Sequence, residues 1–190
     1  MGANTSYASQ GEVGRRLGKL GTGIVYAVHF VASTSVSWGS NHWDIFLQTG
    51  ESEFISLEIT ARAPLGREGY PCRLDILHHS GDVPRRSHKV VAVPAHGWHT
   101  VADFLDVIVQ AGNHMYEFTR EGRGCAGWVH DQFYLFVRAD LMAADKSLEF
   151  EEAINTWWER NAPRGPSPVT HGTYRRDRRG RRLGRRSRTR

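Results

Sequence analysis

One of the two cysteines, Cys125, lies in the stretch "EGRGCAGWVHDQFYLF", at the expected start of an apolar helix. Free backbone N–H groups and the positive dipole end at a helix N-terminus stabilise a thiolate, which lowers the pKa of the thiol and raises its reactivity. Cys125 is therefore a candidate nucleophile. A second interpretation stays open, because unpaired cysteines are among the most buried residues and Gly-Cys-Ala-Gly is also compatible with a close helix–sheet contact.

A cysteine nucleophile needs a base within hydrogen-bond reach and a third group that orients this base. Five of the ten histidines stand in or beside expected turns, where surface histidine is common: His78, His79, His88, His96 and His99. His130 follows Cys125 by five positions on the same helix, about 500° of rotation and about 7.5 Å of rise away, and so points elsewhere. His42 opens "HWDIFLQ", a stretch whose opposite face is apolar. We take His42 as the candidate base.

The hydrophobic pattern predicts the elements that position these residues. Strands are expected over 24–32, 42–48, 54–59, 72–77 and 88–93, the second and third as a hairpin. Cys72 alternates with Leu74 and Ile76 and is predicted to be a buried strand residue. Helical spacing follows over 100–112, which opens with a capping-box-like Thr100 and Asp103, over 125–138 and over 147–160. Strands first and helices after predict an α+β fold, with an antiparallel sheet of about five strands followed by two or three helices.

The stretch "NHWDIFLQTGE", followed 83 residues after its histidine by "GCAGWVHDQF", resembles the His-Trp…Cys order of the circularly permuted papain-like proteins. This branch of the NlpC-type superfamily includes lecithin retinol acyltransferase and its relatives. The resemblance covers roughly residues 24–138 and implies a circularly permuted papain-like topology, with Cys125 as nucleophile and His42 as base. Tyr116 falls about where that branch often has a tyrosine. The pair "NHW" and "GC-x-x-W" also resembles the pattern of a family of small, uncharacterised fungal proteins, which implies no activity.

The sequence departs from the acyltransferase-like branch at the third site position. That branch has a second histidine about a dozen residues after the first, whereas this chain has Glu53 there, followed by Ser56 and Glu58. Glu58 lies on the polar face of its strand, so we assign it the role of the carboxylate that orients His42. "GRG" before Cys125 is a further departure, although glycine would let the backbone approach a substrate closely.

These residues predict a small thiol-dependent hydrolase or acyltransferase that acts on an ester, amide or thioester of a small or lipid-like molecule through an acyl-cysteine intermediate. No organic cofactor and no metal is expected, since no Cys/His spacing is of zinc-site type. A first alternative is a non-catalytic accessory or binding protein of the same fold, acting beside other enzymes of a fungal pathway of secondary metabolism.

A second alternative is a nucleic-acid-associated protein that acts through its basic C-terminal segment. Residues 175–190 contain ten of the 25 basic residues and one of the 20 acidic residues, which gives this segment a formal charge of +9. The whole chain has a formal charge of +5, so residues 1–174 carry −4. Such a segment has little apolar area to bury and is predicted to be disordered. We expect a polar leader over 1–20, one domain over 21–160, and an Arg-rich tail over 161–190 with a hinge at 162–168. The tail would bind nucleic acid or an anionic surface.

Two cysteines predict no disulfide framework and favour a reducing compartment. No secretory signal and no apolar run of roughly 20 residues is apparent, which favours a cytoplasmic protein, or a nuclear one if the Arg-rich tail is a targeting signal. "MGANTS" matches the pattern for N-myristoylation at Gly2. The apolar helix faces are accounted for by one core, so a monomer is expected.

Overall fold

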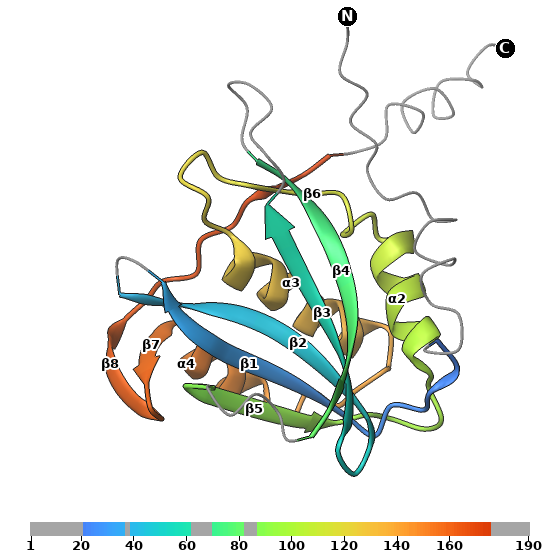
Figure 1. The fold of residues 1–190 in the computed structure, drawn as a ribbon. Coiled ribbons are helices and arrows are strands. Elements are labelled where there is room, and N and C mark those ends of the chain that lie inside the picture. Colours follow the sequence, from blue (N-terminus) through green and yellow to red (C-terminus); the bar gives the residue numbers. More distant parts are fainter. Residues whose placement is uncertain (1–20, 37–38, 62–69, 82–86, 176–190) are drawn as a thin grey trace, which may run out of the picture.

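A computed structural model describes residues 21–36, 39–61, 70–81 and 87–175. The predicted leader, with Gly2, and residues 176–190 lie outside the described residues. Within them, one sheet has seven antiparallel strands in the order β5-β1-β2-β3-β4-β6-β9 (Figure 1). These strands are β1 (Ala27–Val36), β2 (Ser40–Gly50), β3 (Glu53–Ala61), β4 (Tyr70–Ser80), β5 (Lys89–Pro94), β6 (Tyr116–Phe118) and β9 (Thr173–Tyr174).

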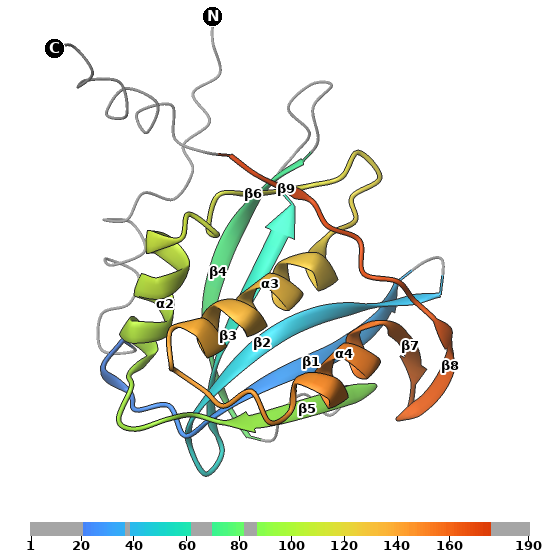
Figure 2. The same ribbon diagram turned by 180° about the vertical axis from the view of Figure 1, so that it is seen from behind.

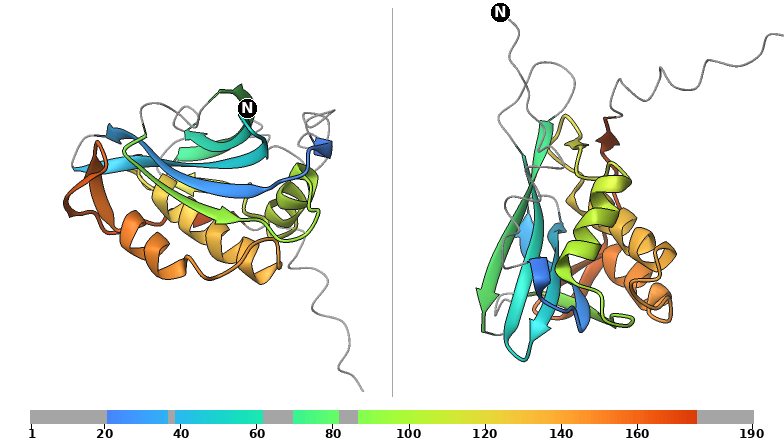
Figure 3. Two further views of the ribbon diagram at one scale, coloured as in Figure 1. Left: turned by 90° about the horizontal axis from the view of Figure 1, so that it is seen from below. Right: turned by 90° about the vertical axis from the view of Figure 1, so that its right-hand side faces the viewer.

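Three described helices pack on one face of this sheet, as the side view in Figure 3 shows. They are α2 (Val101–Gln110), α3 (Cys125–Arg138) and α4 (Ser147–Ile154). The α+β class predicted from the order of elements is therefore confirmed. The five predicted strands correspond to β1 to β5, but the sheet has seven strands because two short segments distant in sequence, β6 and β9, extend its β4 edge.

The core lies between the sheet and α3. Alternating residues of β2 place Trp43, Ile45 and Leu47 in it, while Phe133 of α3 stacks on Phe150 of α4 with ring centroids 4.1 Å apart. Burial of aromatic and aliphatic side chains on this scale is the main source of stability in such a domain. The two elements that carry the site described below, β2 and α3, both contribute side chains to this core.

The capping box predicted for the first long helix is present at the start of α2. Thr100 accepts a hydrogen bond from the backbone N–H of Asp103, and the Asp103 carboxylate accepts one from the backbone N–H of Thr100. The predicted helix over 125–138 has the same bounds as α3. Cys72 is buried in β4, as its alternation with Leu74 and Ile76 predicted.

The third predicted helix is shorter than expected. It ends at Ile154, and the two tryptophans assigned to it, Trp157 and Trp158, lie in strand β7 (Thr156–Glu159). This strand pairs with β8 (Ala162–Pro166) through a two-residue turn at Arg160 and Asn161, both with positive φ. A turn with two positive φ angles matches the twist of the flanking strands, so pairing of β7 with β8 replaces the last helical turns.

The predicted domain boundary near residue 160, with a hinge at 162–168, was placed too early. Residues 162–166 form β8. The chain then crosses α3 and forms β9 of the main sheet. Figure 2 shows this crossing; we call residues 167–175 the C-terminal strap. No described helix is long and apolar enough to cross a membrane.

Candidate active site

The site forms where β2 and β3 separate and the N-terminal end of α3 meets β2. Pairing between these strands ends at Ile45 and Leu57. Beyond that point, the backbone N–H of Trp43 donates a hydrogen bond to the sulfur of Cys125, the first residue of α3. The separation of β2 from β3 thus leaves the backbone N–H of Trp43 available to Cys125 at the start of α3.

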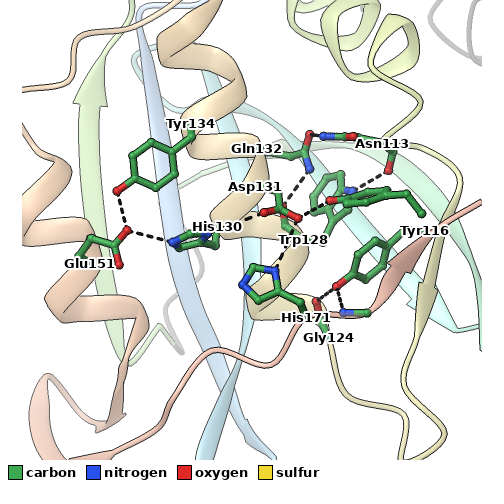
Figure 4. Close-up of polar contacts among 12 residues, drawn as sticks. Asn113, Tyr116, Gly124, Trp128, His130, Asp131, Gln132, Tyr134, Glu151 and His171 are labelled. Carbon is green, nitrogen blue, oxygen red and sulfur yellow. Dashed lines mark hydrogen bonds and ion pairs between the residues drawn. The ribbon is translucent and has the colours of Figure 1, made fainter.

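The turn before Cys125 requires glycine. Gly124 has a φ of 139°, and a Cβ there would lie 3.1 Å from the hydroxyl oxygen of Tyr116. This hydroxyl donates a hydrogen bond to the Gly124 carbonyl and accepts one from the backbone N–H of Gly172 in the C-terminal strap (Figure 4). Tyr116 therefore holds the start of α3 and the strap together.

The structure brings Cys125 and His42 together. Their side chains are hydrogen-bonded to each other, and His42 Nε2 lies 2.9 Å from Oδ1 of Asp44, two residues along the same strand. Ser33 of β1 donates a hydrogen bond to the other carboxylate oxygen of Asp44 at 2.9 Å. Cys125 thus contacts His42, and His42 contacts the buried carboxylate of Asp44. This is the arrangement that an activated thiol needs.

Glu58, which the sequence analysis assigned to orient His42, makes a different contact. Its carboxylate accepts a hydrogen bond from Ser56, whose hydroxyl also contacts Nε2 of His79. The carboxylate beside His42 is Asp44 instead. The physical reason is that pairing of β3 with β2 ends at Leu57, so the pairing that continues through Glu58 is with Asp75 of β4.

Burial and charge act in opposite directions on the two partners. Burial would lower the pKa of His42, but its contacts with Asp44 and Cys125 outweigh this and raise that pKa well above its usual range. Burial would likewise raise the pKa of the Cys125 thiol, but hydrogen bonding and charge from His42, with backbone N–H groups of Trp43 and Ala126, lower it. Both shifts favour a thiolate–imidazolium pair over the neutral thiol and imidazole.

Replacing Asp44 with asparagine is expected to weaken this pair. Loss of the carboxylate charge disfavours the imidazolium, so the pKa of His42 should fall and that of Cys125 should rise. We expect alkylation of Cys125 at pH 6 to slow roughly tenfold or more, since an opposite charge within about 4–6 Å commonly shifts a pKa by about 1–3 units. Iodoacetamide labelling followed by mass spectrometry would measure this.

Asp140→Asn is the matched control, because Asp140 also contacts a histidine, His96, but on the exposed surface. It should leave the labelling rate unchanged. Equal rates in Asp44→Asn and in the unsubstituted protein would show that Asp44 has no part in activating the thiol.

Cys125 and His42 line a cavity of about 410 Å³. Part of its wall is apolar and is formed by Ile59, Phe118, Ile154 and Pro168, while Glu121 and Arg123 supply charge. Cys125 itself is half-buried and forms part of the cavity wall. The other cysteine, Cys72, is not among the residues that line the cavity.

The remaining motif residues position this site. Asn41 exchanges two hydrogen bonds with the backbone of Trp158 and so joins β2 to β7. Trp128 is buried in the core, and its indole N–H donates to the carbonyl of Asn113. In "NHW" and "GCAGW", only His42 and Cys125 thus present reactive groups to the cavity.

Two groups of site residues were missed from the sequence. Asp44 follows His42 by two residues in "HWDIFLQ", and this spacing, which puts both on one face of a strand, was the signal for an orienting carboxylate. Ser167, Pro168 and Thr170 of the C-terminal strap line the cavity, but they lie in a segment that was taken for a hinge and tail. No local pattern indicates that this segment returns to the sheet.

The chain belongs to the family described as a domain of unknown function, DUF7770, whose model matches residues 28–175. The matched range includes β8, the C-terminal strap and β9, along with both His42 and Cys125. Searches of curated proteins and of solved structures found no significant match to the chain.

Proposed function

We propose that this member of the DUF7770 family is a small thiol-dependent hydrolase or acyltransferase with Cys125 as its nucleophile. The observation that carries the proposal is the contact of Cys125 with His42, and of His42 with Asp44, beside an accessible cavity. Strongly shifted pKa values of paired groups in a cavity are typical of catalytic sites. A histidine on an early strand and a cysteine at the start of a later helix also agree with a circularly permuted papain-like topology, which we propose for this fold.

In the proposed reaction, the Cys125 thiolate attacks the carbonyl carbon of an ester, amide or thioester. The first N–H groups of α3 have no acceptor within the helix and stabilise the oxyanion of the tetrahedral intermediate. His42, as imidazolium, gives its proton to the departing alcohol, amine or thiol, and an acyl-cysteine remains. Neutral His42 then removes a proton from water or another acceptor, which attacks the acyl-cysteine and regenerates the thiolate.

The cavity supports a small or lipid-like acyl group as the substrate. Its volume of about 410 Å³ lies within the range of small-molecule sites, and apolar side chains contribute to its walls. Besides the His42–Cys125 pair, Arg123 and Glu121 supply charge to its lining. The acyl group can pass to water or to another small acceptor, so the proposed reaction does not need a polymer as acyl acceptor.

The first test is the rate at which iodoacetamide alkylates the native protein between pH 5 and pH 9. His42 lowers the pKa of Cys125. Alkylation of Cys125 should therefore stay fast at pH 6, where a free thiol of pKa ~8.5 is almost fully protonated. Buried Cys72 should label slowly throughout. In His42→Ala, labelling of Cys125 at pH 6 should fall at least about tenfold, as expected when the thiol returns toward its ordinary pKa.

His96→Ala is the control for this test, because it removes an exposed histidine that contacts Asp140 and not Cys125. It should label as the unsubstituted protein does. If Cys125 reacts no faster than Cys72, or reacts only after denaturation, the thiol is structural. The protein would then be a non-catalytic binding protein whose ligand occupies the same cavity.

A further inference from the structure

A second cluster of reactive side chains lies on α3, away from the cysteine. His130 and Asp131 of α3 and His171 of the C-terminal strap each offer one atom to a group whose members all lie within 4.8 Å of one another. Nδ1 of His130 is 3.8 Å from Oδ1 of Asp131, and Nδ1 of His171 is 3.7 Å from Oδ2. Figure 4 shows both imidazoles beside the carboxylate. This arrangement joins the strap to the helix.

One ring nitrogen of His130 contacts a carboxylate, and the other is available to bind a metal ion. Its Nε2 lies 2.9 Å from Oε1 of Glu151, and the hydroxyl of Tyr134 donates to the same oxygen at 2.5 Å. Nδ1 of His130, in contrast, is buried and has no hydrogen-bond partner. A histidine that donates one ring N–H to a carboxylate and presents its other nitrogen is the usual state of a metal ligand.

Asp131 is oriented in a similar way. Its Oδ2 accepts a hydrogen bond of 2.7 Å from the hydroxyl of Tyr174, the last residue of β9. The same carboxylate faces both histidines, so one oxygen is available to each. Carboxylates that bind a metal ion are commonly oriented by a hydrogen bond of this kind.

We propose that His130, Asp131 and His171 bind a divalent transition-metal ion of the zinc class, and that this ion fastens the C-terminal strap to α3. Two imidazole nitrogens and one carboxylate oxygen are a donor set that Zn²⁺ uses in four-coordinate sites, with water as the fourth ligand. Tetrahedral coordination at Zn–N and Zn–O distances of about 2.0–2.2 Å needs donor atoms about 3.3–3.6 Å apart. The observed separations require small side-chain movements.

The exposure of the cluster is suitable for binding from solution. The side chains of His130, Asp131 and His171 are 23%, 30% and 48% exposed, so the cluster lies at the surface, with Nδ1 of His130 as its buried side. The strap that would be fastened contributes Ser167, Pro168 and Thr170 to the wall of the Cys125 cavity. Metal binding would therefore stabilise one wall of the proposed active site without supplying a reacting atom.

The test is calorimetric titration of Zn²⁺ into the full-length, metal-free protein in a Cys125→Ala background. This background removes the thiol, so that failure of zinc binding and failure of the proposed thiol chemistry are distinguishable. One equivalent should bind. His171→Ala and His130→Gln should each weaken binding at least about tenfold. Glu151→Gln, which keeps all three ligands but alters the contacts of Glu151 with His130 and Tyr134, should weaken it about 10–100-fold.

His96→Ala, which removes a histidine that pairs with the exposed carboxylate of Asp140, is the matched control and should bind zinc as the background protein does. Because His171 is half-exposed on the strap, its substitution should leave the circular dichroism spectrum unchanged. Co²⁺ should give the visible absorption of a tetrahedral site, and His171→Ala should lose it. In the background protein Zn²⁺ should also slow amide hydrogen exchange in residues 167–175.

Two outcomes would overturn the proposal. One is the absence of zinc binding by the background protein, which would leave the cluster as a hydrogen-bonded ion-pair network alone. The other is zinc binding of undiminished affinity in both His171→Ala and His130→Gln, which would place the ion elsewhere in the chain.

Discussion

Cys125→Ser is expected to reduce acyl transfer by about 10³-fold or more, as the loss of a nucleophile does in related hydrolytic sites. Serine keeps the size of the side chain but is not ionised near neutral pH, so His42 loses the anion that it contacts. The measurement is release of p-nitrophenol from a series of acyl esters of increasing chain length. Intact mass spectrometry would follow the covalent acyl-enzyme, which should form in the unsubstituted protein and be absent from Cys125→Ser.

Cys72→Ala is the control for this experiment, because Cys72 is buried in β4 and does not line the cavity. It should keep both the turnover and the acyl adduct. Hydrolysis by Cys125→Ser at the rate of the unsubstituted protein would contradict the assignment of the nucleophile. The series of esters also tests the cavity, because chains that exceed its volume of about 410 Å³ should react more slowly.

Gly172→Ala is expected to destabilise the protein by about 3 kcal/mol, at the upper end of the range for an overpacked site. A Cβ at this position would lie 2.0 Å from the Glu117 carbonyl oxygen and 2.8 Å from the ring of Tyr116. Neither the backbone of β6 nor the buried tyrosine can move away easily, so the strap must shift. Urea denaturation would measure the free energy of unfolding, and hydrogen exchange should show loss of protection in residues 167–175.

Gly165→Ala is a matched control in β8, because a Cβ there meets no atom within 4 Å. It should change the free energy of unfolding by no more than about 0.5 kcal/mol. Equal stabilities of Gly172→Ala and Gly165→Ala would show that the strap does not pack against β6 as described. A large loss in Gly172→Ala alone would show that the strap is an integral part of the domain.

The elements whose signals are local agree with the sequence analysis. Apolar runs and alternation of apolar and polar residues predicted β1 to β5, and the Thr100–Asp103 capping box marked the start of α2. The bounds of α3 follow from "GRGC" before it and a helical apolar pattern up to Arg138. These features depend on neighbours within a few residues, so one sequence suffices to predict them.

The candidate site was only partly accessible to the same reasoning. Cys125 and His42 were selected because each residue has a distinctive local position, and the structure places them in contact. Glu58 was assigned to His42 although the sequence does not indicate that pairing of β3 with β2 ends at Leu57. The two-residue spacing of His42 and Asp44, which the assignment did not use, is independent of register, because such neighbours share a face of the strand.

Contacts between distant segments required the three-dimensional structure. "APRGPSP" has the composition of a linker, yet β8 pairs with β7 around a turn of two residues with positive φ. Likewise, His171 meets His130 and Asp131 because Gly127 and Gly172 lack side chains where the strap crosses α3 and β6. The pattern of apolar residues records which face of an element is buried, whereas the partner it meets depends on how the whole chain packs.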